Sequence, residues 1–223
     1  MMKSKRWIIR KDYDIKVVER LAESLGVDKI IATLLVERGI TSFDEARCFF
    51  RPSLDQIHNP FLMKDMDRAI RRIDEAISRG ERIMIYGDYD VDGTSAVALL
   101  YSYLGAFYSN IDFYIPDRDT EGSGISYQGI NTAHESGVKL MIALDCGINA
   151  VEQVDYAAER GIDFIIGDHH LLGNELPRAV AVLDPKRPDC PYPYKELSGC
   201  GISFKIVEAH LESRLGVRLC DDP

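Results

Sequence analysis

The residues best suited to chemistry are acidic and histidine side chains that directly follow short apolar runs. They stand where predicted strands end: Asp88, Asp90 and Asp92 after residues 83–86, Asp145 after 140–144, Asp168, His169 and His170 after 164–166, and Asp184 after 180–183. In open α/β sheets, binding sites lie beyond the carboxyl ends of the strands. We therefore predict that the first three sets form one site, whereas Asp184, which precedes Pro185, is typical of a turn.

Asp88, Asp90 and Asp92 alternate with other residues in the segment Asp88-Tyr-Asp-Val-Asp-Gly93. If this segment stays extended, its three carboxylates point to the same side. Like charges held so close raise one another's pKa unless a positive charge lies among them. A divalent cation is the simplest compensation, and Asp145 with the triplet at 168–170 would complete its ligands.

The donor types narrow the choice of metal. Carboxylate oxygens with one or two imidazoles and no thiolate favour Mn²⁺ or Mg²⁺ over zinc, while iron and cobalt stay open. Five or more carboxylates exceed the needs of one ion, which favours two ions about 3.5–4 Å apart with a hydroxide between them. Such a site performs in-line attack on phosphorus, because one ion generates the nucleophile and both stabilise the charge that develops on the phosphate.

Simpler structural roles compete with this interpretation. A single Asp at a strand end most often caps a helix, and Asp92-Gly93-Thr94 is also typical of a turn before a helix. A lone histidine is more often a hydrogen-bonded structural residue, which is the role we predict for His58, His134 and His210. Capping alone does not explain three such sets at strand ends, so a metal site is favoured.

The elements that would position these residues alternate along the chain from Arg82 onward. Short apolar runs, the predicted strands, cover residues 83–86, 111–115, 140–144, 164–166 and 180–183. Predicted helices cover residues 94–107, 127–136 and 150–160. Continuously apolar strands that alternate with helices predict an α/β fold with a mostly parallel sheet flanked by helices.

Residues 1–64 have a different pattern, which predicts a small helical N-terminal lead-in without chemistry of its own. Segments 17–25 and 28–38 show helical spacing of apolar residues, and each is followed by glycine. Ser42 is a candidate helix cap, with Glu45 three residues on. We assign residues 65–223 to the α/β domain, which begins with a predicted helix over 66–78.

Composition excludes several classes of protein. The chain has 223 residues, of which 46% are hydrophobic and 28% charged, so a disordered or low-complexity chain is excluded. No apolar run approaches the roughly 18 residues of a membrane span, and the apolar stretch after the basic start is too short for a signal peptide. The 5 cysteines form no C-x-x-C pair, which argues against a disulfide framework or a zinc ribbon and favours a reducing cytoplasm.

The net charge of −9 argues against a chain that grips nucleic acid through bulk positive charge. Carboxylates gathered to hold metal ions inflate this negative count, however, and bound ions reverse the local sign. The acidic balance therefore does not exclude a nucleic-acid substrate.

The motifs resemble those of the DHH phosphoesterase family. Asp88-Tyr-Asp-Val-Asp-Gly93 is similar to its first motif, Asp145 to its second, and Asp168-His169-His170 to the triplet that names the family. Within that family, longer stretches resemble the RecJ single-strand-specific DNA exonucleases. These stretches are residues 86–94, 116–124, 144–148 and 192–201, with 49–53 and 59–61 in the lead-in.

The resemblance implies hydrolysis of single-stranded DNA from the 5′ end, releasing mononucleotides, in DNA repair and recombination. It implies Mn²⁺ or Mg²⁺ as cofactor and, besides the DNA, a single-strand-binding protein and a helicase as partners. Carried over by motif, the metal-site residues are Asp88, Asp90, Asp92, Asp145 and His169, with Asp168 at the edge of the site. His170 is the expected contact to the scissile phosphate, as a neutral donor or as an imidazolium. Catalysis is expected to rest on Asp90, Asp145, His169 and His170.

Two further elements are candidate substrate contacts. Arg118, in the loop 116–124, is either a phosphate contact or an ordinary surface arginine. Ser198, Gly199 and Gly201 lead into a helix and could present backbone N–H groups to a phosphate. The alternative is that these glycines only permit a tight turn between strand and helix.

Two features depart from the resembled pattern. Ser123 stands where such proteins often have an aromatic residue, so a stacking contact to a base is expected to be missing. The chain also stops at Asp221-Asp222-Pro223, before the fourth motif of RecJ-like proteins, and we interpret it as C-terminally incomplete. We therefore expect this chain alone to bind metal weakly and single-stranded DNA poorly.

Other functions stay open at this point. The same metal chemistry serves DHH enzymes that act on short oligonucleotides, cyclic dinucleotides or pyrophosphate, although the lead-in and the stretch 192–201 favour RecJ. A non-catalytic scaffold is the alternative of a different class. The presence of Asp90, Asp145 and His169 argues against it.

Overall fold

The computed structural model describes residue 8 and residues 12–216. Some sequence-based expectations concern residues outside this range. They are most of the basic start, Cys220 and the end at Asp221-Asp222-Pro223. The chain forms two compact units, Met1–Ile57 and His58–Pro223.

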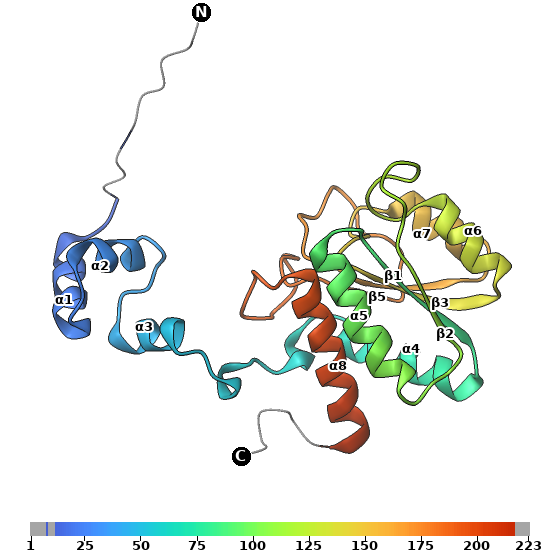
Figure 1. Ribbon diagram of the computed structural model, residues 1–223, viewed down its shortest axis with the longest axis horizontal. Coiled ribbons are helices and arrows are strands. Elements are labelled where there is room, and N and C mark those ends of the chain that lie inside the picture. The colour runs from blue at the N-terminus through green and yellow to red at the C-terminus, as the bar shows by residue number, and fades with distance from the viewer. Residues whose placement is uncertain (1–7, 9–11, 217–223) are drawn as a thin grey trace, which may run out of the picture. The chain divides into compact units, whose positions relative to one another are not determined.

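The first unit is a group of short helices. They are α1 (Ile15–Leu25), α2 (Lys29–Val36), α3 (Phe43–Phe50) and the 3-10 turn η1 (Leu54–Gln56) (Figure 1). Ser42 caps α3 and forms the predicted reciprocal pair of hydrogen bonds with Glu45. Gly26 ends α1 in the left-handed conformation, with φ 66°. Its small core consists of the buried apolar residues Val18, Leu21, Ala22, Ala32, Leu35 and Ala46. The unit ends at Ile57, before the predicted boundary at residue 64.

The second unit is built on one sheet of five parallel strands, and the predicted fold class is confirmed. In chain order its elements are η2 (Pro60–Leu62), α4 (Met66–Arg79), β1 (Arg82–Gly87), α5 (Val91–Gly105), β2 (Ile111–Tyr114), α6 (Tyr127–Glu135), β3 (Val138–Leu144), α7 (Val151–Ala158), β4 (Asp163–Gly167), β5 (Ala181–Leu183) and α8 (Gly199–Leu215). The strand order is β2-β1-β3-β4-β5. The order changes direction at the β1–β3 pair, so the carboxyl ends of these two strands are the expected place for a site.

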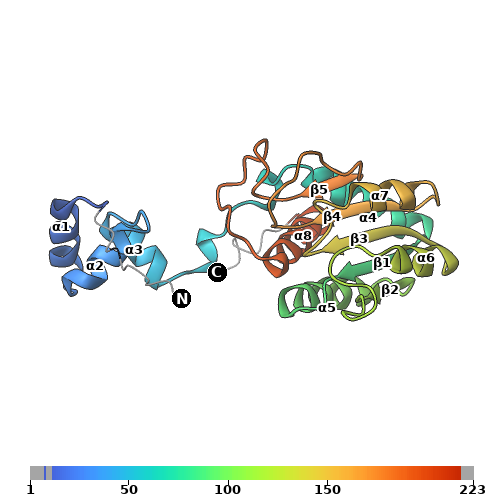
Figure 2. The ribbon, with the colours of Figure 1, turned by 90° about the horizontal axis from the view of Figure 1, so that it is seen from above.

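The strands bury both faces of the sheet, because successive side chains alternate between them. Ile83 and Ile85 of β1 belong to one core, which α4, α5 and α8 cover. Met84 and Tyr86 of the same strand belong to the other core, which α6 and α7 cover. Figure 2 shows the strands as one twisted layer with helices around it. This double burial explains why the strands appear in the sequence as continuous apolar runs.

The described residues include four of the cysteines and all the helices of the structure. Cys48, Cys146, Cys190 and Cys200 are free thiols, so none of them takes part in a disulfide. No helix in the described part of the chain combines the length and the apolar character that crossing a membrane requires.

A buried ion pair ties α8 to the start of the second unit. Nζ of Lys205 lies 2.6 Å from Oε2 of Glu208 and donates to the carbonyl oxygen of His58 at 2.7 Å. The side chains of Lys205 and Glu208 are 3% and 2% exposed. Removing one member of such a pair leaves an uncompensated charge in the interior.

We expect Lys205→Met to lower the free energy of unfolding by about 3 kcal/mol, because the Glu208 carboxylate would stay buried without its partner. Lys205→Met combined with Glu208→Gln should recover most of this loss. Urea unfolding followed by circular dichroism measures both variants. A double variant that is less stable than the single variant would contradict this account of the pair.

Candidate metal centre

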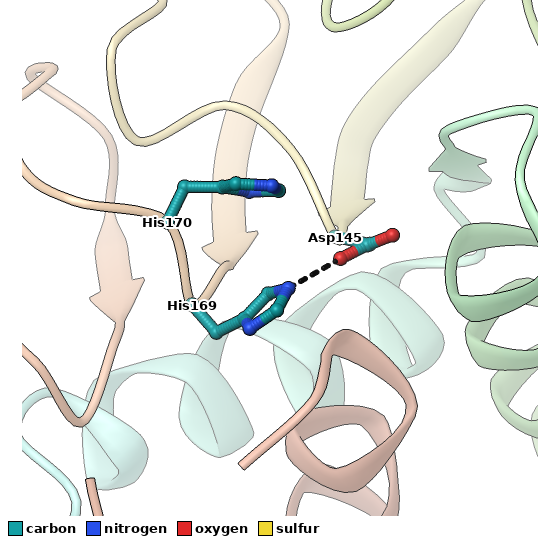
Figure 3. A group of neighbouring side chains, drawn as sticks. All are labelled: Asp145, His169 and His170. Carbon is teal, nitrogen blue, oxygen red and sulfur yellow. Dashed lines mark ion pairs between the residues drawn. The ribbon is translucent and has the colours of Figure 1, made fainter. Parts of the chain in front are cut away.

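The carboxyl ends of the two neighbouring strands β3 and β4 bring three predicted site residues together. Asp145 follows β3, and His169 and His170 follow β4. One ligand atom from each of these residues lies within 4.8 Å of the other two. Figure 3 shows the His169 ring directed at the Asp145 carboxylate, with the His170 ring beside it.

Asp145 is a buried carboxylate without adequate compensation. It is 2% exposed, and its backbone has φ 62°, in the left-handed region. Its Oδ1 lies 3.0 Å from Nε2 of His169 but forms no hydrogen bond. Burial, and then the charges of Asp92 and Asp90, raise the pKa of Asp145 to about 8. A bound cation would offset both effects, because it stabilises the ionised carboxylate.

The first motif is not extended over its whole length. β1 ends at Gly87, and α5 begins at Val91 with Asp90 as its N-cap, whose Oδ1 accepts from the N–H of Gly93. The condition under which Asp88, Asp90 and Asp92 would point to one side of a strand is therefore not met, and the alternative of a turn into a helix is what the structure shows. The chain turns directly into a helix because Asp90 accepts from the N–H of Gly93, one of the amides in the first turn of α5 that lack an intrahelical partner. A Cβ at Gly93 would lie 2.5 Å from the carbonyl oxygen of Asp88, so this turn requires glycine.

The bend nevertheless keeps the three carboxylates near the strand ends. Asp88 lines a cleft of about 360 Å³ together with Asp145, Asp168 and His170. Oδ2 of Asp92, in the first turn of α5, lies 3.6 Å from Nε2 of His169. Burial opposes the ionisation of Asp92, but two backbone amides of α8 outweigh this effect and lower its pKa. His169 thus lies between two acidic side chains that come from different elements.

Asp168 holds the two histidines in place. It is 1% exposed, and its Oδ1 accepts from the backbone N–H groups of His169 and His170 and from the His170 ring at Nδ1. Its Oδ2 accepts from the N–H of Ile148 at 2.8 Å. Both oxygens therefore have protein donors, and Oδ1 fixes the backbone of both histidines and the ring of His170.

His170 presents its other ring nitrogen away from Asp168. The ring lies against the same cleft, and its side chain is 58% exposed. Burial lowers the pKa of His170, but the bond to Asp168 outweighs this effect and raises it. A proton on Nδ1 is thus held by Asp168, which leaves Nε2 available to a molecule in the cleft.

A network that the sequence did not reveal holds the loop 116–126 beside the site. Glu121 accepts hydrogen bonds from the hydroxyl of Tyr114, the N–H of Asp117 and the hydroxyl of Ser126. Tyr86, the last apolar residue before the first motif, donates its hydroxyl to the carbonyl of Gly124. The Glu-Gly-x-Gly pattern marked this loop, but no local signal pointed to Glu121 as its organising residue.

The same loop carries Arg118. Its guanidinium carbon lies 5.3 Å from the ring centroid of Tyr89, which stands between Asp88 and Asp90. Ser123 of this loop lines the cleft. Arg118 thus lies next to the first motif, as a phosphate contact would require.

The turn at Ser198 does not offer its amides to a phosphate in this structure. The N–H groups of Gly199 and Cys200 donate to Asp92, and that of Gly201 donates to the hydroxyl of Ser198. The prediction that the amides of this turn bind a phosphate is therefore corrected. The carboxylate of Asp92 occupies the position that a phosphate would take.

Two remaining predictions concern residues near or outside the site. Asp184 forms the predicted turn, with Oδ1 accepting from the N–H of Lys186. It is also fully buried, and this burial raises its pKa to about 6. His210 is structural as predicted, since its ring bonds to Tyr103 and Asp74.

Comparison with known proteins agrees with the fold and the motifs. Residues 82–219 match the DHH family, N-terminal domain, and the chain belongs to this family. It is 43% identical over 212 residues to the single-stranded-DNA-specific exonuclease RecJ of Bacillus subtilis (strain 168). This alignment covers 95% of this chain and 27% of that protein. It is 35% identical over 148 residues to RecJ of Escherichia coli (strain K12), in an alignment that covers 66% of this chain and 26% of that protein.

Solved structures show the same relationship. A crystal structure of exonuclease RecJ bound to manganese aligns with a TM-score of 0.62 and 30% identity, over 70% of this chain and 39% of that one. RecJ from Thermus thermophilus in complex with Mn²⁺ aligns with a TM-score of 0.69 and 25% identity, over 92% of this chain and 28% of that one. The chain spans about a quarter of the length of the curated relatives it matches.

We expect Asp145→Asn to stabilise the metal-free protein and to abolish Mn²⁺ binding at the site. Asparagine tolerates the left-handed backbone at this position, so the change mainly removes a charge. Folding raises the pKa of Asp145 from 3.8 to about 8, so the wild type loses stability as the pH rises through this interval. The variant should therefore exceed the wild type by about 2 kcal/mol or more at pH 8 in EDTA, and by less at pH 5.

Chemical unfolding at both pH values measures this difference, and calorimetric titration measures the loss of Mn²⁺ binding. Asp67→Asn is the matched control, since the side chain of Asp67 is 70% exposed. Lower stability of Asp145→Asn at pH 8 would show that the Asp145 carboxylate is compensated without a metal.

Proposed function

We propose that this chain carries the metal-dependent catalytic site of a single-strand-specific DNA exonuclease. The observation that carries the proposal is the buried Asp145 carboxylate, whose Oδ1 has no hydrogen-bond partner and lies 3.0 Å from His169. The match to RecJ exonucleases of Bacillus subtilis and Escherichia coli supports single-stranded DNA as the substrate. Release of mononucleotides from the 5′ end is part of the same proposal.

The donor set fits a hard divalent ion. Asp145 and His169 would hold it, with Asp88, Asp90 and Asp92 completing one or two ion positions and Asp168 orienting the histidines. Oxygen and imidazole donors without a thiolate suit Mn²⁺ or Mg²⁺. The solved RecJ structures bound to manganese support this choice. When bound, such an ion supplies positive charge for the phosphate and activates water for attack on phosphorus.

Residues of the chain supply the remaining functions. His170 would donate from Nε2 to a phosphate oxygen, since Asp168 holds its Nδ1. Asp168 also fixes the peptide that joins the two histidines, so the ring positions are set before substrate binds. Arg118 would bind a phosphate of the strand from the loop beside Tyr89. A single-strand-binding protein and a helicase as partners, and a cytoplasmic location, stay predictions.

The test is hydrolysis of 5′-phosphorylated single-stranded DNA in Mn²⁺, beside a dinucleotide and pyrophosphate, with Asp90→Ala as the control variant. We expect stepwise loss of nucleotides from the long strand, none with Asp90→Ala, and none in EDTA. Cleavage of only the dinucleotide or of pyrophosphate would move the chain to another activity within the DHH family. Failure of the wild-type chain to bind Mn²⁺ at all would overturn the proposal.

Arg118 gives a prediction about substrate affinity. Arg118→Ala should raise KM for single-stranded DNA about tenfold or more with a smaller effect on kcat, because one charge-assisted contact to phosphate is lost. Arg178→Ala is the matched control, since that side chain is 76% exposed and pairs with Asp155. Steady-state kinetics on a labelled strand measures both, and equal KM values for the two variants would rule out the phosphate contact.

A further inference from the structure

We propose that the first turn of α8 is a positioning element for the metal centre and that Gly199 makes this possible. The inference rests on the proposed metal site. It assigns to Gly199 and to the backbone amide of Cys200 a role in setting the position of Asp92 and Asp145. The role is structural support of ligands and involves no contact with substrate.

The amides of α8 hold Asp92 at both carboxylate oxygens. The N–H of Gly199 donates to Oδ2 at 2.7 Å, and the N–H of Cys200 donates to Oδ1 at 2.8 Å. These groups belong to the first turn of a helix, where amides lack intrahelical partners and the helix dipole favours negative charge. Asp92 is therefore fixed in the direction in which its Oδ2 lies 3.6 Å from His169.

Gly199 also lies directly against Asp145. A Cβ at position 199 would stand 2.5 Å from Cβ, 2.6 Å from Oδ1 and 2.7 Å from Cγ of Asp145. Asp145 cannot give way easily, because it is buried and its Cβ moves only with the backbone. Only glycine fits at position 199, because any side chain there would clash with Asp145. Glycine therefore allows the start of α8 to pack directly against Asp145.

The helix cannot retreat without cost either. Ser203, one turn further along α8, is fully buried and donates its hydroxyl to the carbonyl oxygen of Ala96 in α5 at 2.9 Å. Figure 1 shows α5 and α8 side by side, and Ala96, Leu100, Ile202 and Ile206 share one core. Since α5 also carries Asp92, the packing of two helices determines how that carboxylate meets the strand ends.

Gly201 offers a matched control in the same turn. A Cβ at position 201 would meet only side-chain atoms, of which the nearest is Cδ2 of Leu197 at 3.3 Å. That leucine side chain is able to shift by a few tenths of an ångström. Gly199→Ala and Gly201→Ala therefore make the same chemical change in the same turn with different consequences for Asp145.

The experiment is Mn²⁺ titration of the purified chain, followed by electron paramagnetic resonance of free Mn²⁺, with thermal unfolding in EDTA as a second readout. We expect Gly199→Ala to bind Mn²⁺ at least about tenfold more weakly than wild type, and Gly201→Ala to stay within about twofold. Wild-type affinity in Gly199→Ala, or equal weakening in both variants, would overturn the inference. Absence of binding in the wild type would instead overturn the proposed function, and the inference with it.

A second pair of variants removes a donor rather than adding an atom, and it decides the question if Gly199→Ala fails to fold. Cys200→Pro deletes one amide that serves Asp92, at the second position of α8, where the N–H has no intrahelical partner to lose. Cys200→Ala keeps the amide and removes only the thiol. Weaker Mn²⁺ binding in Cys200→Pro than in Cys200→Ala is the expected result, and equal affinities would overturn the role of the amide.

Discussion

The second unit depends on one constraint: a carboxylate lies buried at the carboxyl end of its central strand. Asp145 follows β3, which has β1 on one side and β4 on the other. Its Oδ1 has no hydrogen-bond partner, and nearby acidic groups oppose its ionisation. A protein keeps such a group at a cost in stability, which is reasonable where a cation compensates the charge in the working state.

The surrounding elements serve this one position. Asp168 binds the backbone and ring of the histidine segment through Oδ1 and the N–H of Ile148 through Oδ2, so that His169 faces Asp145 and His170 faces the cleft. Helices α5 and α8, which pack together on one face of the sheet, bring Asp92 and the amides that hold it. The loop 116–126 closes the other side through Glu121 and Tyr86. The residues of the proposed site and their supports therefore come from the ends of β1, β3 and β4, the starts of α5 and α8, and the loop 116–126.

The sheet and the site were largely predictable from the sequence, and the reason is physical. Strands buried on both faces appear as continuous apolar runs, so the predicted run at 140–144 falls within β3 (Val138–Leu144). Parallel strands share one carboxyl edge, so residues that follow the runs had to meet there. The structure places Asp145 and His169 in one cluster at this edge, and their role as metal ligands stays a prediction.

The errors arose where distant partners or a local turn decided the outcome. Alternating Asp residues are compatible with a strand and with a turn into a helix, and the cap formed by Asp90 selected the helix. The amides at Gly199 and Cys200 bind Asp92, more than a hundred positions away, which no local pattern reveals. Glu121 was missed for the same reason, since its role follows from contacts within a folded loop.

The most direct measurement of the central claim is anomalous diffraction at the manganese edge from crystals grown with Mn²⁺. We predict a peak about 2 Å from Oδ1 of Asp145 and from a ring nitrogen of His169, with Asp92 still held by the first turn of α8. No peak at this end of the sheet, or a peak that lacks Asp145 as a ligand, would contradict a metal centre built around the buried carboxylate.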